Sequence, residues 1–258
     1  MTEIIANFPA FLLVLVRVSS FFVTLPLFSY RTLPAIHRIG IAFFISWIMF
    51  LSMDKPTLEI DGFFYLLIMK EAIVGLFIGL VAYMIFAAIQ IAGGFIDFQM
   101  GFAIANVMDP QTGAQSPLMG QYLYTFALLF LLAINGHHLL LDGVFYSYRF
   151  IPMEQLWIPF GNENLLESVL DAFNSMFIIA FQMSMPVVGS LFLVDIALGI
   201  VARAVPQINV FVVGLPLKIG VSFIVLIIAM SMMFMLVGDL VENMLYTMRG
   251  LMEIMGGS

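Results

Sequence analysis

Charged side chains inside apolar stretches are the residues of this chain that could carry chemistry. Five of them, Lys70, Glu71, Asp195, Arg203 and Lys218, lie near or within such stretches. A set of this kind is typical of a proton or ion relay in a membrane protein, and equally typical of ion pairs that fix one helix against another. The sequence leaves both interpretations open. A sixth charge, Arg17, interrupts the first apolar segment, and we expect it to face protein in an assembly instead of lipid.

The other reactive side chains do not form a catalytic or metal-binding pattern. His137 and His138 are adjacent, so on a helix their side chains project about 100° apart and do not make a two-ligand face. No serine, histidine and acid set has a catalytic spacing, and no glycine-rich phosphate loop with a lysine follows a strand. Without any cysteine, thiol catalysis, thiolate metal sites and disulfides are excluded. We therefore expect no enzymatic activity, no metal and no cofactor.

The composition predicts that these charges belong to an integral membrane protein. Of the 258 residues, 63% are hydrophobic and only 10% are charged, which lies far from the composition of soluble domains. The net charge of −7 leaves no basic patch to neutralise phosphates, so a nucleic-acid partner is excluded. We expect the chain to be surrounded by membrane lipid.

About six hydrophobic segments, all predicted to be helical, must position the charges. They span residues 8–28, 39–53, 63–95, 123–134, 172–194 with the continuation 196–200, and 211–237. Several are broken by proline or carry a charge, which helices covered by other subunits tolerate better than helices bathed in lipid. The region 139–171 is acidic and is predicted to be a connection. Since no internal repeat and no long linker is present, we predict an all-α membrane protein with a single domain over residues 1–258.

Residues 98–122 form the one long polar interruption without lysine or arginine. Pro110 and Pro117 forbid a continuous helix, and glycines such as Gly113 permit unusual backbone angles. The stretch is nevertheless too apolar for an ordinary solvated linker. Non-helical backbone in a membrane protein is tolerated where protein buries it or where it lines a watery cavity. We therefore predict a loop against or inside a pore, with a surface loop as the alternative.

Gly75 and Gly79 have the Gly-x-x-x-Gly spacing that lets a second helix approach the backbone closely. A specific helix contact and general packing are both compatible with this spacing.

Three motifs, in order along nearly the whole chain, resemble the FliR family of export-gate subunits, which serves flagella and the injectisomes of type III secretion. Residues 99–110 read Gln-Met-Gly-Phe-Ala-Ile-Ala-Asn-Val-Met-Asp-Pro, residues 135–138 read Asn-Gly-His-His, and residues 205–218 read Val-Pro-Gln-Ile-Asn-Val-Phe-Val-Val-Gly-Leu-Pro-Leu-Lys. The Gln-Met-Gly-Phe and Pro-Gln-Ile-Asn signatures point to the flagellar branch.

The resemblance implies an all-helical subunit, packed as helical hairpins, that joins FliP and FliQ homologues in a hetero-oligomeric gate. That gate is closed at rest, passes unfolded flagellar subunits across the bacterial inner membrane at the flagellar basal body, and works beside FlhB and FlhA homologues. The family's pore plug corresponds by position to residues about 106–120. The plug residues it implies here are Asn106, Met108, Asp109, Pro110, Gly113, Pro117, Leu118, Met119 and Gly120.

A protein-export channel subunit is thus the leading interpretation. A secondary transporter or ion channel for a small solute is the alternative, because transporters also have broken helices and intramembrane charges. Two related halves with matching breaks would be expected of a transporter, and none is apparent in the sequence. An intramembrane enzyme is not expected, because the sequence lacks a catalytic set of residues.

Overall fold

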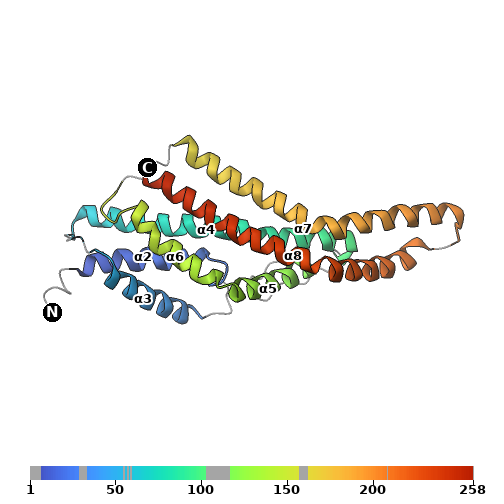
Figure 1. The fold of residues 1–258 in the computed structure, drawn as a ribbon, viewed down its shortest axis with the longest axis horizontal. Helices are drawn as coiled ribbons and strands as arrows, with labels where there is room; N and C mark the ends of the chain where they lie inside the picture. The colour runs from blue at the N-terminus through green and yellow to red at the C-terminus, as the bar shows by residue number, and fades with distance from the viewer. Residues whose placement is uncertain are drawn as a thin grey trace. The chain divides into compact units, whose positions relative to one another are not determined.

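Helices connected by turns make up the whole of the chain that can be described. The structure, a computed structural model, describes residues 7–28, 34–54, 56, 58, 60–102, 117–156, 162–207 and 209–257. Its helices are α2 (Phe8–Thr24), α3 (Ala35–Ser52), α4 (Gly62–Met100), α5 (Leu118–Ala133), α6 (Gly136–Phe150), α7 (Glu163–Ala204) and α8 (Val210–Gly256) (Figure 1). Within these residues no strand occurs, so the predicted all-α class is confirmed.

Four of these helices are long and apolar enough to cross a membrane, namely α3, α4, α7 and α8. Helices α5 and α6 pass the same test only as a pair, and they are bent by 73° at their junction. Asn135 forms that junction in the left-handed backbone conformation, with a φ of 58°. Asparagine tolerates this conformation better than most residues, which explains why the chain turns there. The prediction of an integral membrane protein is therefore confirmed.

The predicted acidic connection at 139–171 is partly wrong, because α6 occupies its beginning and α7 already starts at Glu163. Leu140, Val144 and Tyr148 follow one another at four-residue spacing and are all buried, while Asp142 and Arg149 are exposed. The charges on one face of the helix hid the apolar stripe on the other. Helix α8 likewise continues to Gly256, well beyond the predicted end at residue 237.

The contacts divide the chain into two compact units. Unit 1 draws on Met1–Ile85, Asn135–Phe173 and Glu242–Ser258, and unit 2 on Phe86–Ile134 and Asn174–Val241. Helices α4, α7 and α8 each contribute residues to both units. This division does not test the single domain predicted over residues 1–258, which stays a prediction.

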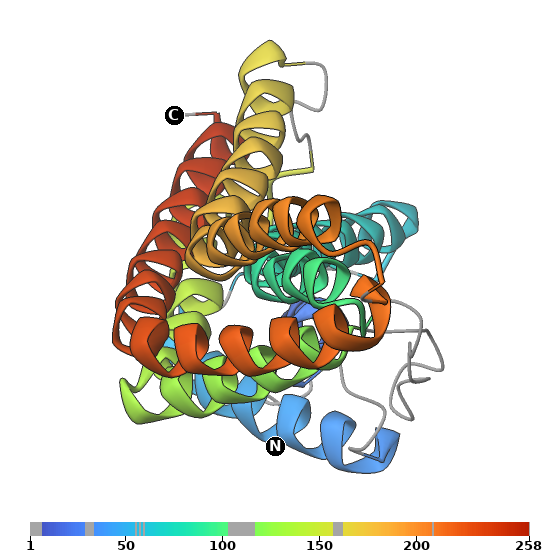
Figure 2. The same cartoon turned by 90° about the vertical axis from the view of Figure 1, so that its right-hand side faces the viewer.

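Aromatic contacts hold each unit together. In unit 1 the Phe11 ring of α2 meets the rings of Phe43 and Trp47 from α3 edge to face, with centroids 5.5 and 5.4 Å apart. In unit 2 α5 lies beside α8, where the Phe130 and Phe234 rings stack at 5.6 Å (Figure 2). Helix α7 ends at Ala204 and α8 begins at Val210, and the two helices form a hairpin there (Figure 1). Edge-to-face and offset contacts are the favoured arrangements of aromatic pairs.

Candidate functional site

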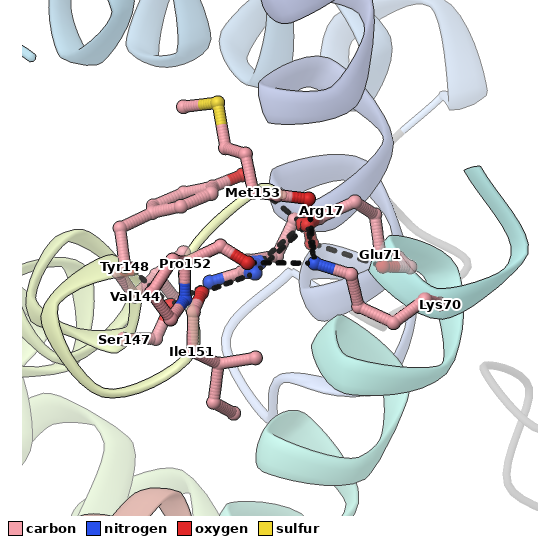
Figure 3. Close-up of polar contacts among 10 residues, drawn as sticks. Arg17, Lys70, Glu71, Val144, Ser147, Tyr148, Ile151, Pro152 and Met153 are labelled. Carbon is pink, nitrogen blue, oxygen red and sulfur yellow. Dashed lines mark hydrogen bonds and ion pairs between the residues drawn. The ribbon is translucent and has the colours of Figure 1, made fainter. Parts of the chain in front are cut away.

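A buried ion-pair cluster joins α2 and α4 inside unit 1 (Figure 3). The Arg17 guanidinium bonds both oxygens of the Glu71 carboxylate, at 2.9 Å from Nη2 to Oε1 and by a second contact from Nε to Oε2. The Lys70 ammonium donates to the same Oε1 at 2.5 Å. Arg17 and Glu71 are wholly buried, and Lys70 is 4% exposed. Two cations therefore share one carboxylate away from solvent.

The excess positive charge is stabilised by α6 and the turn that follows it. Arg17 donates to Ser147 Oγ at 2.9 Å and to the carbonyl of Ile151 at 3.0 Å. Lys70 donates to the carbonyls of Pro152 and Met153, at 3.0 and 3.2 Å. Carbonyl groups at a helix C-terminus lack partners within the helix and carry the negative end of its dipole. The end of α6 is therefore well suited to receive two cations.

Tyr148 completes the cluster from α6. Its ring lies under the Arg17 guanidinium, 3.6 Å from Cζ to the ring centroid, which is a cation–π contact. Its hydroxyl donates to Glu71 Oε2 at 3.3 Å. Sequence reasoning missed Ser147 and Tyr148, because both lie in the stretch interpreted as a connection. The signal that could have found them was the four-residue apolar spacing of α6.

The remaining intramembrane charges lie elsewhere. In unit 2, Asp195 of α7 accepts an ion pair from Lys218 of α8 at 2.5 Å and a hydrogen bond from Gln99 of α4 at 2.9 Å. Arg203 lies exposed in the last turn of α7. In both groups the charged atoms already contact opposite charges or acceptors. This geometry favours helix-fixing ion pairs over a relay.

Gly75 and Gly79 lie where α4 meets α2. A methyl group added at Gly75 would overlap Ser20 Oγ and the carbonyl oxygen of Arg17. At Gly79 it would overlap Thr24 Oγ1 and lie 2.9 Å from the carbonyl oxygen of Phe21. The backbones of the two helices thus approach as closely as the absence of side chains allows, beside the ion-pair cluster.

A second glycine contact, which sequence reasoning missed, joins α4 and α5 in unit 2. A methyl group at Gly93 would overlap the backbone of Gly120. One turn further along α4, Asp97 is 2% exposed and both its oxygens accept the Met119 amide, at 3.2 and 3.1 Å. Asp97 was not among the predicted intramembrane charges. Its place at the edge of the polar stretch was the only signal for it.

The predicted plug residues fall into two groups. Asn106, Met108, Asp109, Pro110 and Gly113 lie outside the described residues. Pro117 precedes α5, and Leu118, Met119 and Gly120 form its first turn, so the predicted loop at 98–122 is too long at both ends. Helix α5 begins this early because Asp97 supplies an acceptor for a first-turn amide. Met119 and Gly120 are buried against α4.

The described residues contain no group of three histidine, cysteine or acidic side chains able to hold a metal. His137 and His138 lie with their rings 4.1 Å apart at the start of α6.

Comparison with known proteins adds an independent finding. Residues 8–244 match the family described as bacterial export proteins, family 1. The whole chain is 62% identical to the whole of the flagellar biosynthetic protein FliR of Bacillus subtilis (strain 168), over 259 aligned residues. It is 28% identical to the FliR protein of Escherichia coli (strain K12), over 81% of this chain and 79% of that one. It is 32% identical to the Yop proteins translocation protein T of Yersinia pestis, over 86% of each.

Proposed function

This chain belongs to family 1 of the bacterial export proteins and is a membrane-embedded component of a type III export apparatus, and on that premise we propose that it is a subunit of the flagellar export gate. In this proposal it joins FliP and FliQ homologues in a closed channel that passes unfolded flagellar subunits. The gate lies in the inner membrane at the basal body, beside FlhB and FlhA homologues. The chain itself catalyses no reaction. The flagellar assignment is supported by the 62% identity over the full length, against 32% to the Yop protein.

The observation that carries the proposal is the length of uncovered apolar surface on α7. With 42 residues, this helix is about 63 Å long at about 1.5 Å per residue. Only 11% of its most apolar stretch is buried within the chain. Exposed apolar side chains run from Leu166, which is 64% exposed, to Ile200, which is 65% exposed.

The same holds for α8, which has 47 residues and is 22% buried in its most apolar stretch. Its exposed apolar side chains extend from Phe211, at 88%, to Tyr246, at 66%. The hydrocarbon core of a bilayer is about 30 Å thick, so lipid alone does not cover such lengths on two helices. Other protein surfaces must cover the rest, as neighbouring subunits of a gate would do.

The seal that the resemblance assigns to residues 106–120 stays a prediction from the sequence, because most of those residues lie outside the described chain. The described part of the stretch contributes only its helical end, at Leu118–Gly120.

The proposal is tested by expressing the tagged chain, alone and with FliP and FliQ homologues, and purifying it in mild detergent. We expect a single large complex from co-expression and an aggregated or short-lived product from the chain alone. A strain lacking its own family member should regain flagellar export when it carries this chain. A stable monomer that transports a small solute in liposomes would contradict the proposal and support the transporter alternative.

A further inference from the structure

Helix α5 begins without a cap from its own sequence. Its N-cap residue is Pro117, and no side chain at that position accepts a hydrogen bond from the first turn. The first-turn amides of a helix have no partner within the helix, and in apolar surroundings each needs an acceptor. Met119, the second residue of α5, is only 4% exposed, so its amide is one of the groups that need an acceptor.

The acceptor comes from another helix. Asp97 lies in the last turn of α4, and its carboxylate bonds the Met119 amide through both oxygens. Among the described residues no lysine or arginine forms an ion pair with Asp97. The buried charge is therefore held by the positive end of the α5 dipole, which favours a carboxylate at this place.

The glycine contact one turn earlier makes this arrangement specific. Gly93 and Asp97 are four residues apart and share one face of α4. At Gly93 the backbone of α5 is so close that a side chain would overlap Gly120. At Gly120 a side chain would lie 3.0 Å from the carbonyl oxygen of Gln90. The two glycines set how closely the helices meet, and the carboxylate sets which residue of α5 faces the end of α4.

We propose that Asp97 is a positioning residue of the export gate, holding the start of α5 in register against the end of α4. This inference rests on the proposed function. The bond joins the two helix ends that bracket residues 101–117, so it determines where the chain leaves α4 and where it enters α5. A cap from within α5 would stabilise the helix equally well but would leave its position on α4 unspecified.

The absence of cysteine in the chain allows a direct measurement of this register. The Phe86 and Tyr124 rings of α4 and α5 lie with centroids 5.2 Å apart, so cysteines at these two positions, bridged by a short thiol-specific bifunctional reagent, report the helix pairing by cross-link yield. Cysteines at Phe11 and Phe43, whose rings are 5.5 Å apart in unit 1, serve as a reference pair. Both pairs are measured in the assembled complex.

Asp97→Ala should lower the α4–α5 cross-link yield and flagellar export, because loss of one helix-capping bond shifts the equilibrium between the paired and the separated arrangement of the two helices by about fivefold. Asp97→Asn keeps one acceptor oxygen, so its cross-link yield and export should lie between those of the unmodified chain and those of Asp97→Ala. The reference pair should not respond. Asp61→Ala is the matched control, because Asp61 also caps a helix, accepting the Phe64 amide at 3.0 Å, but does so locally on α4.

The decisive variant combines Asp97→Ala with Pro117→Asp, which returns a capping carboxylate from within α5. We expect the cross-link yield and export to stay low, because α5 is then capped but no longer tied to α4. Full rescue would show that Asp97 is a helix cap and nothing more, and would overturn the inference. An unchanged cross-link yield in Asp97→Ala, or normal export despite a reduced yield, would overturn it as well. Failure of the unmodified chain to restore export would instead refute the proposed function, while the cross-linking series would still test the register.

Discussion

The guanidinium of Arg17 donates two hydrogen bonds to the carboxylate of Glu71, and both side chains are wholly shielded from solvent. The pair joins α2 to α4 across 54 positions of sequence. Lys70 shares the same carboxylate, so among the described residues Glu71 is the only acid that pairs with these two buried cations.

Glu71→Gln should therefore be one of the most damaging single changes in unit 1. The amide keeps the size of the side chain but leaves two buried cations without a counter-charge, which costs about 3–5 kcal/mol for a buried pair. The free energy of unfolding of the purified complex, measured by titration with a denaturing detergent, checks this. Glu253→Gln is the control, because Glu253 pairs with Arg249 where the two side chains are 42% and 67% exposed. There a loss of at most about 1 kcal/mol is expected, and equal losses for the two variants would contradict the prediction.

Substitutions of Tyr148 should separate its ring from its hydroxyl. Tyr148→Phe keeps the ring beneath Arg17 and removes only the 3.3 Å bond to Glu71, so a loss of about 0.5–1.5 kcal/mol is expected. Tyr148→Ala removes the ring as well and should cost about 3–5 kcal/mol. The same unfolding measurement gives both values. A phenylalanine variant as unstable as the alanine variant would mean that the hydroxyl, and not the ring, carries the contact.

Alanine at Gly75 and at Gly189 should have opposite effects. At Gly75 the added methyl group meets Ser20 Oγ and the backbone of Arg17, so overpacking should cost about 1–3 kcal/mol and reduce assembly. At Gly189, inside α7, nothing lies within 4 Å of the added atom. Alanine there should stabilise the helix by about 0.5–1 kcal/mol. The yield and the melting temperature of the complex are the readouts, and a loss at both positions would show that the α2 contact is not the cause.

Two neighbouring glycines on α4 give a sharper comparison. Gly93→Ala meets the backbone of Gly120, which has no flexible end to move, so we expect α4 and α5 to separate and assembly to fail. Gly94→Ala meets only Pro117 Cγ, at 3.4 Å, which is an ordinary contact. The second variant should assemble normally. Comparable complex yields for the two would exclude the close approach of α4 and α5.

Charge exchange tests the Asp195–Lys218 pair. Asp195→Lys alone places two ammonium groups together and should destabilise the α7–α8 hairpin. Adding Lys218→Asp should recover a coupling energy of about 0.5–3 kcal/mol, because opposite charges then face each other again. Gln99 tolerates either arrangement, since its amide offers both a donor and an acceptor. A double variant no better than the sum of its single changes would show that the two charges do not interact.

The sequence by itself determined the class of the protein, its family and most of its helices. Apolar composition and the spacing of Gly75 and Gly79 are local properties, readable over a few turns of chain. Where charge and apolar periodicity overlapped, as in α6, the charges misled the interpretation. At 98–122 the polar residues concealed the helical ends at Met100 and Leu118.

Only the tertiary structure decided which charges meet. Arg17 finds its acceptors at Glu71, Ser147 and Ile151, up to 134 positions away. Asp97 becomes a capping group only because Gly93 and Gly120 let α5 come close enough. Hydrophobicity and helix propensity act between neighbours in the chain, whereas a buried charge is satisfied by whatever packing brings beside it. The partner of such a charge is therefore a property of the packed helices and not of the segment that carries it.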